Sequence, residues 1–189
     1  MAHRTLDDEQ LVLLAQGGDR TAFDQLAERH STRLRRVLFR ITRNCDAAYD
    51  AVQEALMRAW QNIGRFEGRS QFSTWLTRIG INEASRGLRG SAEPPLELTD
   101  QVGERIPAWG ARPDEVFESR EFLQAVDRVL GELPLDYRTA VTLRDVEGLS
   151  TAEAAEILGI GERALKSRVH RGRMALRAEL DDYFKEGYG

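Results

Sequence analysis

The chain has 189 residues, of which 41% are hydrophobic and 31% are charged, and its net charge is −4 at pH 7. This length and composition are typical of one or two compact domains. No run of residues approaches the ~20 apolar residues of a membrane-spanning helix, and the N-terminus lacks the apolar stretch of a signal peptide. We therefore expect a cytoplasmic protein without membrane insertion.

Cysteine and histidine usage argues against a metal site and against enzyme chemistry. Cys45 is the only cysteine, and the histidines are His3, His30 and His170, far apart in sequence. The chain also has no glycine-rich phosphate loop and no recognisable set of catalytic side chains. We expect no metal, no other cofactor and no catalytic residues.

Apolar residues recur with helical spacing through the first half of the chain. Three stripes predict three amphipathic helices: the first is Phe23, Leu26, Leu34, Val37, Leu38 and Ile41, the second is Tyr49, Val52, Leu56, Ala59, Trp60 and Ile63, and the third is Phe72, Trp75, Leu76 and Ile79. A glycine-flanked loop over 64–70 precedes the third stripe. We predict that three or four helices form a first domain over residues 1–90.

The helical pattern breaks after this domain. Residues 90–113 contain four prolines and three glycines, which predicts an extended, flexible linker over 91–113. Between 91 and 121, eight acidic residues stand against three arginines. This acidic segment would be repelled by DNA, so it is either a segment that threads a basic protein channel or an ordinary solvated linker.

A second helical domain is predicted over 114–189. Its first apolar positions are Phe117, Leu123, Val126 and Leu130, followed by Leu133-Pro134 and by a helix that ends at Gly148. Strand-like alternation is nearly absent from the whole sequence. The predicted fold class is therefore all-α, with two small helical domains joined by a flexible acidic linker.

The last part of the second domain has the pattern of a helix-turn-helix. Ser150 and Glu153 form a capping box, Gly159 suits the turn, and Leu165 and Val169 face inward from the second helix. Between 162 and 177 there are six Arg or Lys residues and one acidic residue. This charge favours DNA phosphate as the partner over a merely solvated helix.

Four motifs in order along the chain resemble one family. They are Asp50-x-x-Gln53-Glu54 with Arg58-Ala59-Trp60, the segment FEGRSQFSTWLTRIGIN over 66–82, Leu133-Pro134 with Arg138, and Lys166-Ser167-Arg168-x-His170-Arg171. Together they resemble a bacterial extracytoplasmic-function sigma factor, the small kind that keeps sigma regions 2 and 4. Residues that depart from the family pattern are Ala47, Tyr49, Arg86 and Arg163-Ala164; those at 86 and 163 lie near the expected DNA.

The resemblance implies a promoter-specificity subunit that binds core RNA polymerase and promoter DNA. The residues it assigns to docking on the beta and beta-prime subunits are Asp50, Gln53, Glu54, Met57 and Arg58. By their own spacing, these residues could also be a solvated face with an ion-pair ladder.

The third helix and its preceding loop are expected to bind the melted −10 element through polar and basic side chains. The assigned residues are Arg65, Ser70, Arg78, Asn82, Arg86 and Arg89. Phe72, Trp75 and Leu76 are predicted to be core residues rather than platforms for stacked bases.

The last helix is expected to read the −35 element as duplex DNA, with Lys166, Ser167 and His170 at base edges. The residues expected to contact the DNA phosphate backbone are Arg163, Arg168, Arg171 and Arg173. His170 could alternatively be a pH-sensitive or core histidine. The family further implies an anti-sigma factor as a partner. The alternative to a sigma factor is a stand-alone helix-turn-helix repressor or activator.

Overall fold

The computed structural model describes residues 6–89 and 120–187, with side chains over 6–88 and 126–178. All regular structure within these ranges is helical, so the predicted all-α class is confirmed. The chain divides into two compact units, Met1–Ala92 and Glu93–Gly189. The predicted linker over 91–113 lies outside the described residues, as does Phe117.

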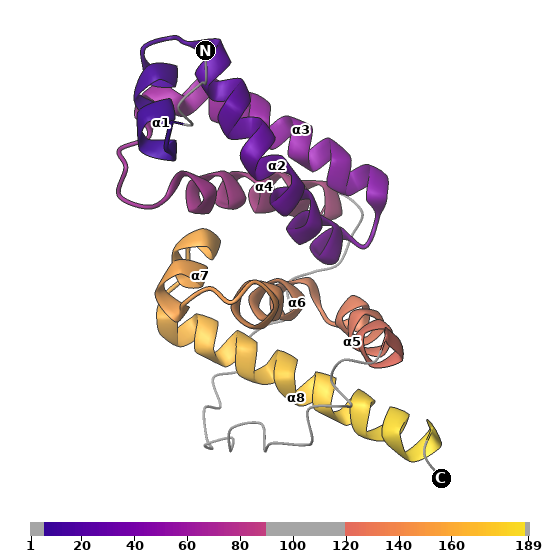
Figure 1. Ribbon diagram of the computed structural model, residues 1–189. Coiled ribbons are helices and arrows are strands. Elements are labelled where there is room, and N and C mark those ends of the chain that lie inside the picture. Colours follow the sequence, from indigo (N-terminus) through magenta and orange to yellow (C-terminus); the bar gives the residue numbers. More distant parts are fainter. Residues whose placement is uncertain (1–5, 90–119, 188–189) are drawn as a thin grey trace. The chain divides into compact units, whose positions relative to one another are not determined.

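The first unit is built from four α-helices and one short turn of 3-10 helix (Figure 1). They are α1 (Asp8–Gln16), α2 (Arg20–Thr42), α3 (Cys45–Asn62), η1 (Ile63–Arg65) and α4 (Phe72–Arg89). Asp7, Asp19 and Asn44 cap the first three helices, and each side chain accepts a hydrogen bond from a backbone N–H of the first turn.

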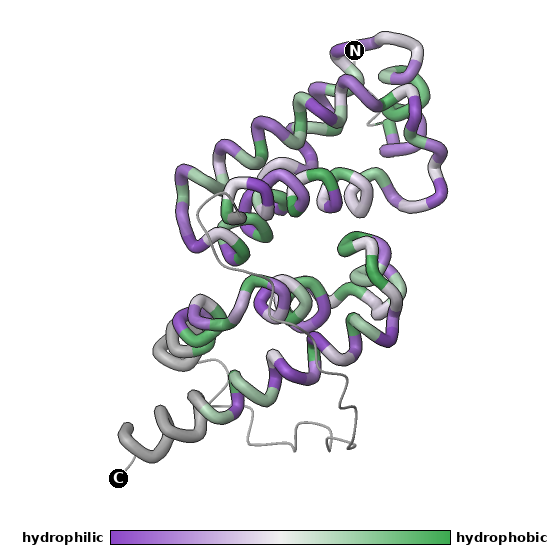
Figure 2. Tube along the Cα trace, turned by 180° about the vertical axis from the view of Figure 1, so that it is seen from behind, coloured by the Kyte–Doolittle hydropathy of each residue, from purple (hydrophilic) through white to green (hydrophobic). Residues whose placement is uncertain are grey.

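The core of the first unit contains every apolar residue predicted to face inward from α2, from Phe23 to Ile41. Green and purple alternate along these helices in Figure 2, as amphipathic helices require. Helix α4 crosses α2 so closely that a Cβ on Gly80 would lie 2.9 Å from Leu34 Cδ1. Glycine at position 80 therefore permits the α2–α4 contact.

One inward prediction in α3 is wrong. Tyr49 is 55% exposed, and the buried face of α3 instead consists of Ala48, Ala51, Val52, Ala55 and Ala59. These small side chains let α3 approach its neighbours closely, and the helical period then directs Tyr49 away from the core. The prediction is wrong because it assigns the large aromatic side chain of Tyr49 to the core instead of the neighbouring alanines.

The second unit contains α5 (Arg120–Glu132), α6 (Leu135–Val141), η2 (Thr142–Val146), α7 (Thr151–Leu158) and α8 (Glu162–Gly187). The three α-helices α5, α6 and α7 pack along one side of the long helix α8 (Figure 1). Their core includes Val129, Leu130, Leu133, Val141 and Leu176. Of the predicted apolar positions in α5, Leu130 is buried and Val126 is partly buried, while the side chain of Leu123 lies outside the described residues.

The predicted helix-turn-helix is confirmed residue by residue. Ser150 Oγ accepts from the backbone N–H of Glu153 at 3.2 Å, and Glu153 Oε2 accepts from the backbone N–H of Ser150 at 2.8 Å. Gly159 ends α7 with φ 64°, in the left-handed region that favours glycine. Leu165 and Val169 are buried on the inner side of α8.

Candidate nucleic-acid and polymerase interfaces

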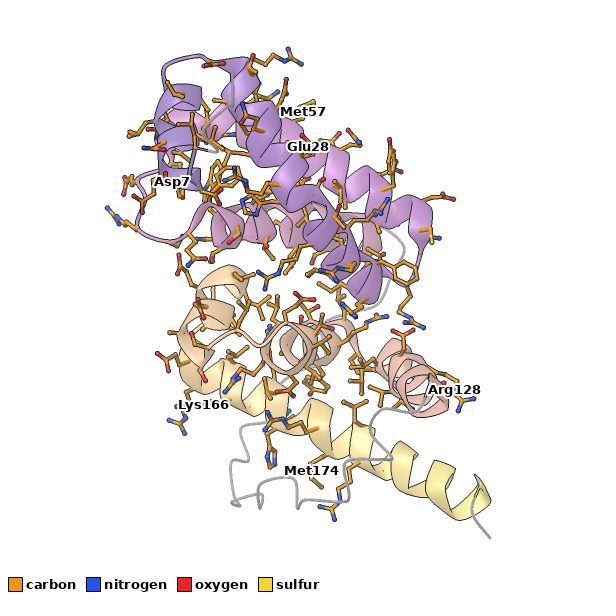
Figure 3. The ribbon with its side chains drawn as sticks, viewed as in Figure 1. Asp7, Glu28, Met57, Arg128, Lys166 and Met174 are labelled. Atoms are coloured by element: carbon orange, nitrogen blue, oxygen red, sulfur yellow. The ribbon has the colours of Figure 1, made fainter. Side chains whose placement is uncertain are left out.

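Helix α8 exposes part of its basic motif on the side opposite its buried residues. Arg163 and Lys166 are exposed, and Ser167 and His170 are half-buried. Figure 3 shows Lys166 and, further along, Met174 projecting from α8 away from α5 and α6. This face can lie in a groove of duplex DNA with donors that are not used by the protein's own core.

The other three arginines of the motif contact α6 and η2 within the same unit. Arg168 pairs with Asp136 at 3.0 Å, and Arg171 Nη1 donates to the hydroxyl of Tyr137 at 3.3 Å. Arg173 donates twice to Asp145, from Nε at 2.9 Å and from Nη2 at 2.5 Å. These contacts hold the three guanidinium groups against α6 and η2.

Asp145, the partner of Arg173, belongs to η2, which is a turn of π-helix. The backbone N–H of Glu147 donates to the carbonyl of Thr142 at 2.9 Å, five residues earlier, which widens the helix at this point. The hydrogen bond from Arg173 to the Asp145 carboxylate raises the pKa of Arg173 above its ordinary value. The two hydrogen bonds fix the guanidinium of Arg173 against η2.

Helix α3 presents the predicted polymerase-docking residues. Asp50, Gln53, Glu54 and Met57 are exposed along one side, and Met57 leaves 49% of its surface open to solvent. Arg58 behaves differently, because its Nε lies 3.0 Å from Glu83 of α4 but 3.8 Å from Glu54. The structure thus separates Arg58 from the other four and directs it toward α4.

Glu83 of α4 connects α4 to α3 through its ion pair with Arg58. Its side chain is only 10% exposed, and besides Arg58 it accepts from Arg86 Nη1 at 2.9 and 3.1 Å. A carboxylate this far buried is stable only when its oxygens are paired in this way. The two cations are thereby held at a common site.

An open pocket of about 340 Å³ lies at this contact between α3 and α4 in the first unit. It is lined by Arg58, Asn62, Arg65, Trp75, Ile79, Asn82, Glu83 and Arg86. Guanidinium and amide donors beside a half-buried indole are the groups that hold unstacked bases and their phosphates. The pocket brings three of the residues predicted for −10 binding together with one predicted for polymerase docking.

The remaining residues predicted for −10 binding lie elsewhere. Arg78 is exposed on α4 but does not line the pocket, and Ser70 is half-buried in the loop before α4. The side chain of Arg89 is outside the described residues. Phe72 and Leu76 are core residues as predicted, whereas Trp75 is half-buried and forms part of the pocket wall.

The sequence analysis did not identify the acidic partners of Arg86, Arg168 and Arg173. Glu83 lies three residues before Arg86, a spacing that favours an ion pair on a helix and could have been found. Asp145 and Asp136 are far from their arginines in sequence, and no local pattern indicates either contact. These two ion pairs form only because α6 and η2 pack on α8.

No helix in the ranges 6–89 and 120–187 combines the length and apolar character needed to span a bilayer. Within the same part of the chain, no three His, Cys, Asp or Glu residues cluster so that they could hold a metal ion.

Comparison with known proteins identifies the family to which this two-unit helical chain belongs. Residues 26–93 match the family model for sigma-70 region 2, and residues 123–176 match that for sigma-70 region 4. The chain is 34% identical over 186 residues to the RNA polymerase sigma-H factor of Pseudomonas aeruginosa, covering 95% of this chain and 96% of that one.

Two further comparisons support the same family. The ECF RNA polymerase sigma factor SigW of Bacillus subtilis is 34% identical over 173 residues, with 87% of this chain and 92% of SigW covered. The sigma factor RpoE of Bartonella quintana, solved with the anti-sigma factor NepR, superposes with a TM-score of 0.63 at 29% identity, covering 84% of this chain and 96% of that one. The chain belongs to the extracytoplasmic-function (ECF) sigma factors of the sigma-70 family, which are promoter-recognising transcription initiation factors.

Proposed function

We propose that this sigma factor reads its promoters through two surfaces, one on each unit. The pocket of the first unit holds part of the melted −10 strand, and the exposed face of α8 reads the −35 element as duplex. The observation that carries the proposal is that each unit presents exposed cations on one surface: Arg163 and Lys166 on α8 of the second unit, and Arg65 and Arg86 at the pocket of the first. Exposed cations of this kind are what a surface needs to bind DNA phosphates.

On α8, Lys166, Ser167 and His170 take the base-edge positions. Lys166 suits the O6 and N7 acceptors of guanine, and the half-buried His170 lies one turn further along the same face. Arg163 is the exposed cation for phosphate, and Arg168, Arg171 and Arg173 add positive charge beside the DNA backbone. Their pairs with Asp136, Tyr137 and Asp145 orient them.

In the first unit, Arg65, Asn82 and Arg86 bind the single strand within the pocket, and Trp75 supplies an aromatic wall. Arg78, Ser70 and Arg89 extend this surface along the loop and α4. Opening of the promoter exposes bases that basic and amide side chains can hold outside the stack.

Docking on core polymerase falls to the α3 stripe of Asp50, Gln53, Glu54 and Met57. These side chains are exposed and combine acidic groups with one large apolar residue. We assign Arg58 to both functions, because it borders the stripe and also lines the −10 pocket. The beta and beta-prime subunits are the expected partners.

An anti-sigma factor is expected to control this activity by covering the same surfaces, since the similar RpoE of Bartonella quintana was solved with one. The protein works in the cytoplasm, where polymerase and promoters are, and it supplies no catalytic group of its own. The domain division that we propose is 1–90 for region 2, 91–113 for the linker and 114–189 for region 4.

The proposal is tested by run-off transcription with purified core polymerase on genomic fragments that include the upstream region of the protein's own gene. Specific transcripts should start downstream of paired −35 and −10 sequences only when the protein is added. Specific DNA binding without polymerase, together with no new transcript, would contradict the proposal and indicate a stand-alone regulator.

A further inference from the structure

Gln16, the last residue of α1, is hydrogen-bonded to the chain that leads into the −10 pocket. Its Nε2 donates to the carbonyl of Ile63 at 3.1 Å and to the carbonyl of Phe66 at 2.7 Å. Ile63 is the first residue of η1 and Phe66 follows Arg65, the last residue of η1. A single side chain 47 and 50 residues away in sequence thus holds both ends of this turn.

Both N–H groups of the Gln16 amide are used, so the side chain acts as a donor only at this contact. The carbonyl of Ile63 also accepts from the backbone N–H of Phe66 at 3.0 Å, so Gln16 adds a second donor to the bond that closes η1. Gln16 itself is fixed because α1 is anchored by the buried residues Leu11, Val12 and Ala15. The support therefore runs from the core, through α1, to the turn.

The same turn is held on its other side by aromatic contacts. The ring of Phe66 lies 5.0 Å from the ring of Trp75 and 6.1 Å from that of Phe72, measured between centroids. Trp75 and Arg65 both line the pocket. A shift of the backbone at 63–66 would consequently move one cation and one aromatic wall of the pocket together.

We propose that Gln16 is a positioning residue for −10 recognition: it fixes η1 so that Arg65 and Trp75 are placed for the melted strand. The inference rests on the proposed −10 role of the pocket and adds a contributor from α1, which touches no DNA itself. Exposed Arg65 needs such support, because a cation on an unsupported turn would lose conformational freedom on binding.

The test compares three variants of Gln16 with a matched control in the same helix. Gln16→Glu and Gln16→Met keep the approximate size and remove both donors, whereas Gln16→Lys restores a donor. The control is Gln10→Glu, because Gln10 uses its side chain only as an acceptor from Asp7 N, a role that glutamate also fills. Each variant is assembled with core polymerase and bound to fork-junction DNA carrying a single-stranded −10 element.

Gln16→Glu and Gln16→Met should weaken fork-junction binding about tenfold, the effect expected when two ordinary positioning hydrogen bonds are lost. Gln16→Lys should recover most of the loss, and Gln10→Glu should bind as the natural sequence does. Affinity for core polymerase and for a −35 duplex should stay unchanged in all four. Trypsin should also cleave after Arg65 faster in the two donor-free variants.

Undiminished fork-junction binding by Gln16→Glu and Gln16→Met would overturn the inference. So would a loss that appears equally in core binding, or one that Gln16→Lys leaves uncorrected, because either result indicates a general structural role. Arg65→Ala and Asn82→Ala, measured in parallel, separate the two proposals. If these also bind normally, the pocket itself has been misassigned; if they alone bind weakly, only the role of Gln16 is wrong.

Discussion

Lys166 and Arg163 are both exposed cations on α8, but their positions assign them different tasks. Lys166 is the proposed base-reading cation, so Lys166→Ala should cost about 1–3 kcal/mol at the preferred −35 sequence and relax the preference at one base pair. Arg163→Ala should weaken binding to all DNA sequences equally. It should also reduce the slope of log binding constant against log salt concentration by about one unit. Holoenzyme binding to promoters with each −35 position varied measures both.

Equal and sequence-independent losses for the two variants would show that Lys166 is only another phosphate contact. Specificity would then have to come from Ser167, His170 or DNA shape.

Arg173 and Asp145 form a two-point ion pair whose partners remain partly open to solvent, at 43% and 27% exposure. Because water and salt screen such a pair, we predict a coupling energy below about 1 kcal/mol in a double-mutant cycle with Asp145→Ala and Arg173→Ala. Urea unfolding at low salt gives this value, and it should fall further in high salt. A coupling of several kcal/mol that salt does not change would contradict this view of a screened surface pair.

At the scale of elements, the exposed stripe of α3, Asp50, Gln53, Glu54 and Met57, is the proposed polymerase contact. Gln53 and Glu54 contribute nothing to the core, so replacing them with Ala and Lys should weaken core polymerase binding and leave the helical fold intact. A pull-down with core polymerase, with circular dichroism as the control for folding, measures this. Undiminished binding by the folded variant would rule out α3 as the docking element.

The crossing of α6 and α8 depends on Gly172. A Cβ at this position would lie 2.5 Å from Val141 Cγ2, inside a buried contact. Gly172→Ala should therefore lower the free energy of unfolding by about 1–3 kcal/mol, although alanine favours helix by roughly 1 kcal/mol.

Gly87 of α4 is the matched control, since a Cβ there meets nothing within 4 Å. Gly87→Ala should be neutral or stabilising by up to about 1 kcal/mol. Urea unfolding of both variants tests the pair of expectations. Similar changes in the free energy of unfolding for the two variants would mean that α6 can move away from α8 without loss of stability.

For the whole molecule, the two units should fold independently. Each contains its own set of buried residues, and the family models match one region in each. Fragments 1–92 and 93–189 should both be helical, and their circular dichroism spectra should add up to that of the full chain. An unfolded fragment would show that the units depend on each other for stability.

Local sequence was sufficient to predict α2 and the helix-turn-helix. The stripe from Phe23 to Ile41, the capping box at Ser150 and the turn at Gly159 depend on residues within a few positions of one another, and the structure has each of them. Each of the four sigma-factor motifs also consists of residues that are close together in sequence, so the motifs could be recognised without the structure. Tyr49 was misplaced because local spacing alone does not decide between an aromatic residue and an alanine stripe.

The partners of the functional side chains were decided by tertiary structure. Arg58 turns to Glu83 rather than Glu54, Arg173 turns to Asp145, and Gln16 reaches across to Ile63 and Phe66. The sequence by itself determined the helices, because they follow from short-range periodicity and capping, and its four motifs were sufficient to show the resemblance to the family. Only the tertiary structure decided which cations pair with carboxylates, because ion pairs between helices depend on how distant segments meet in space.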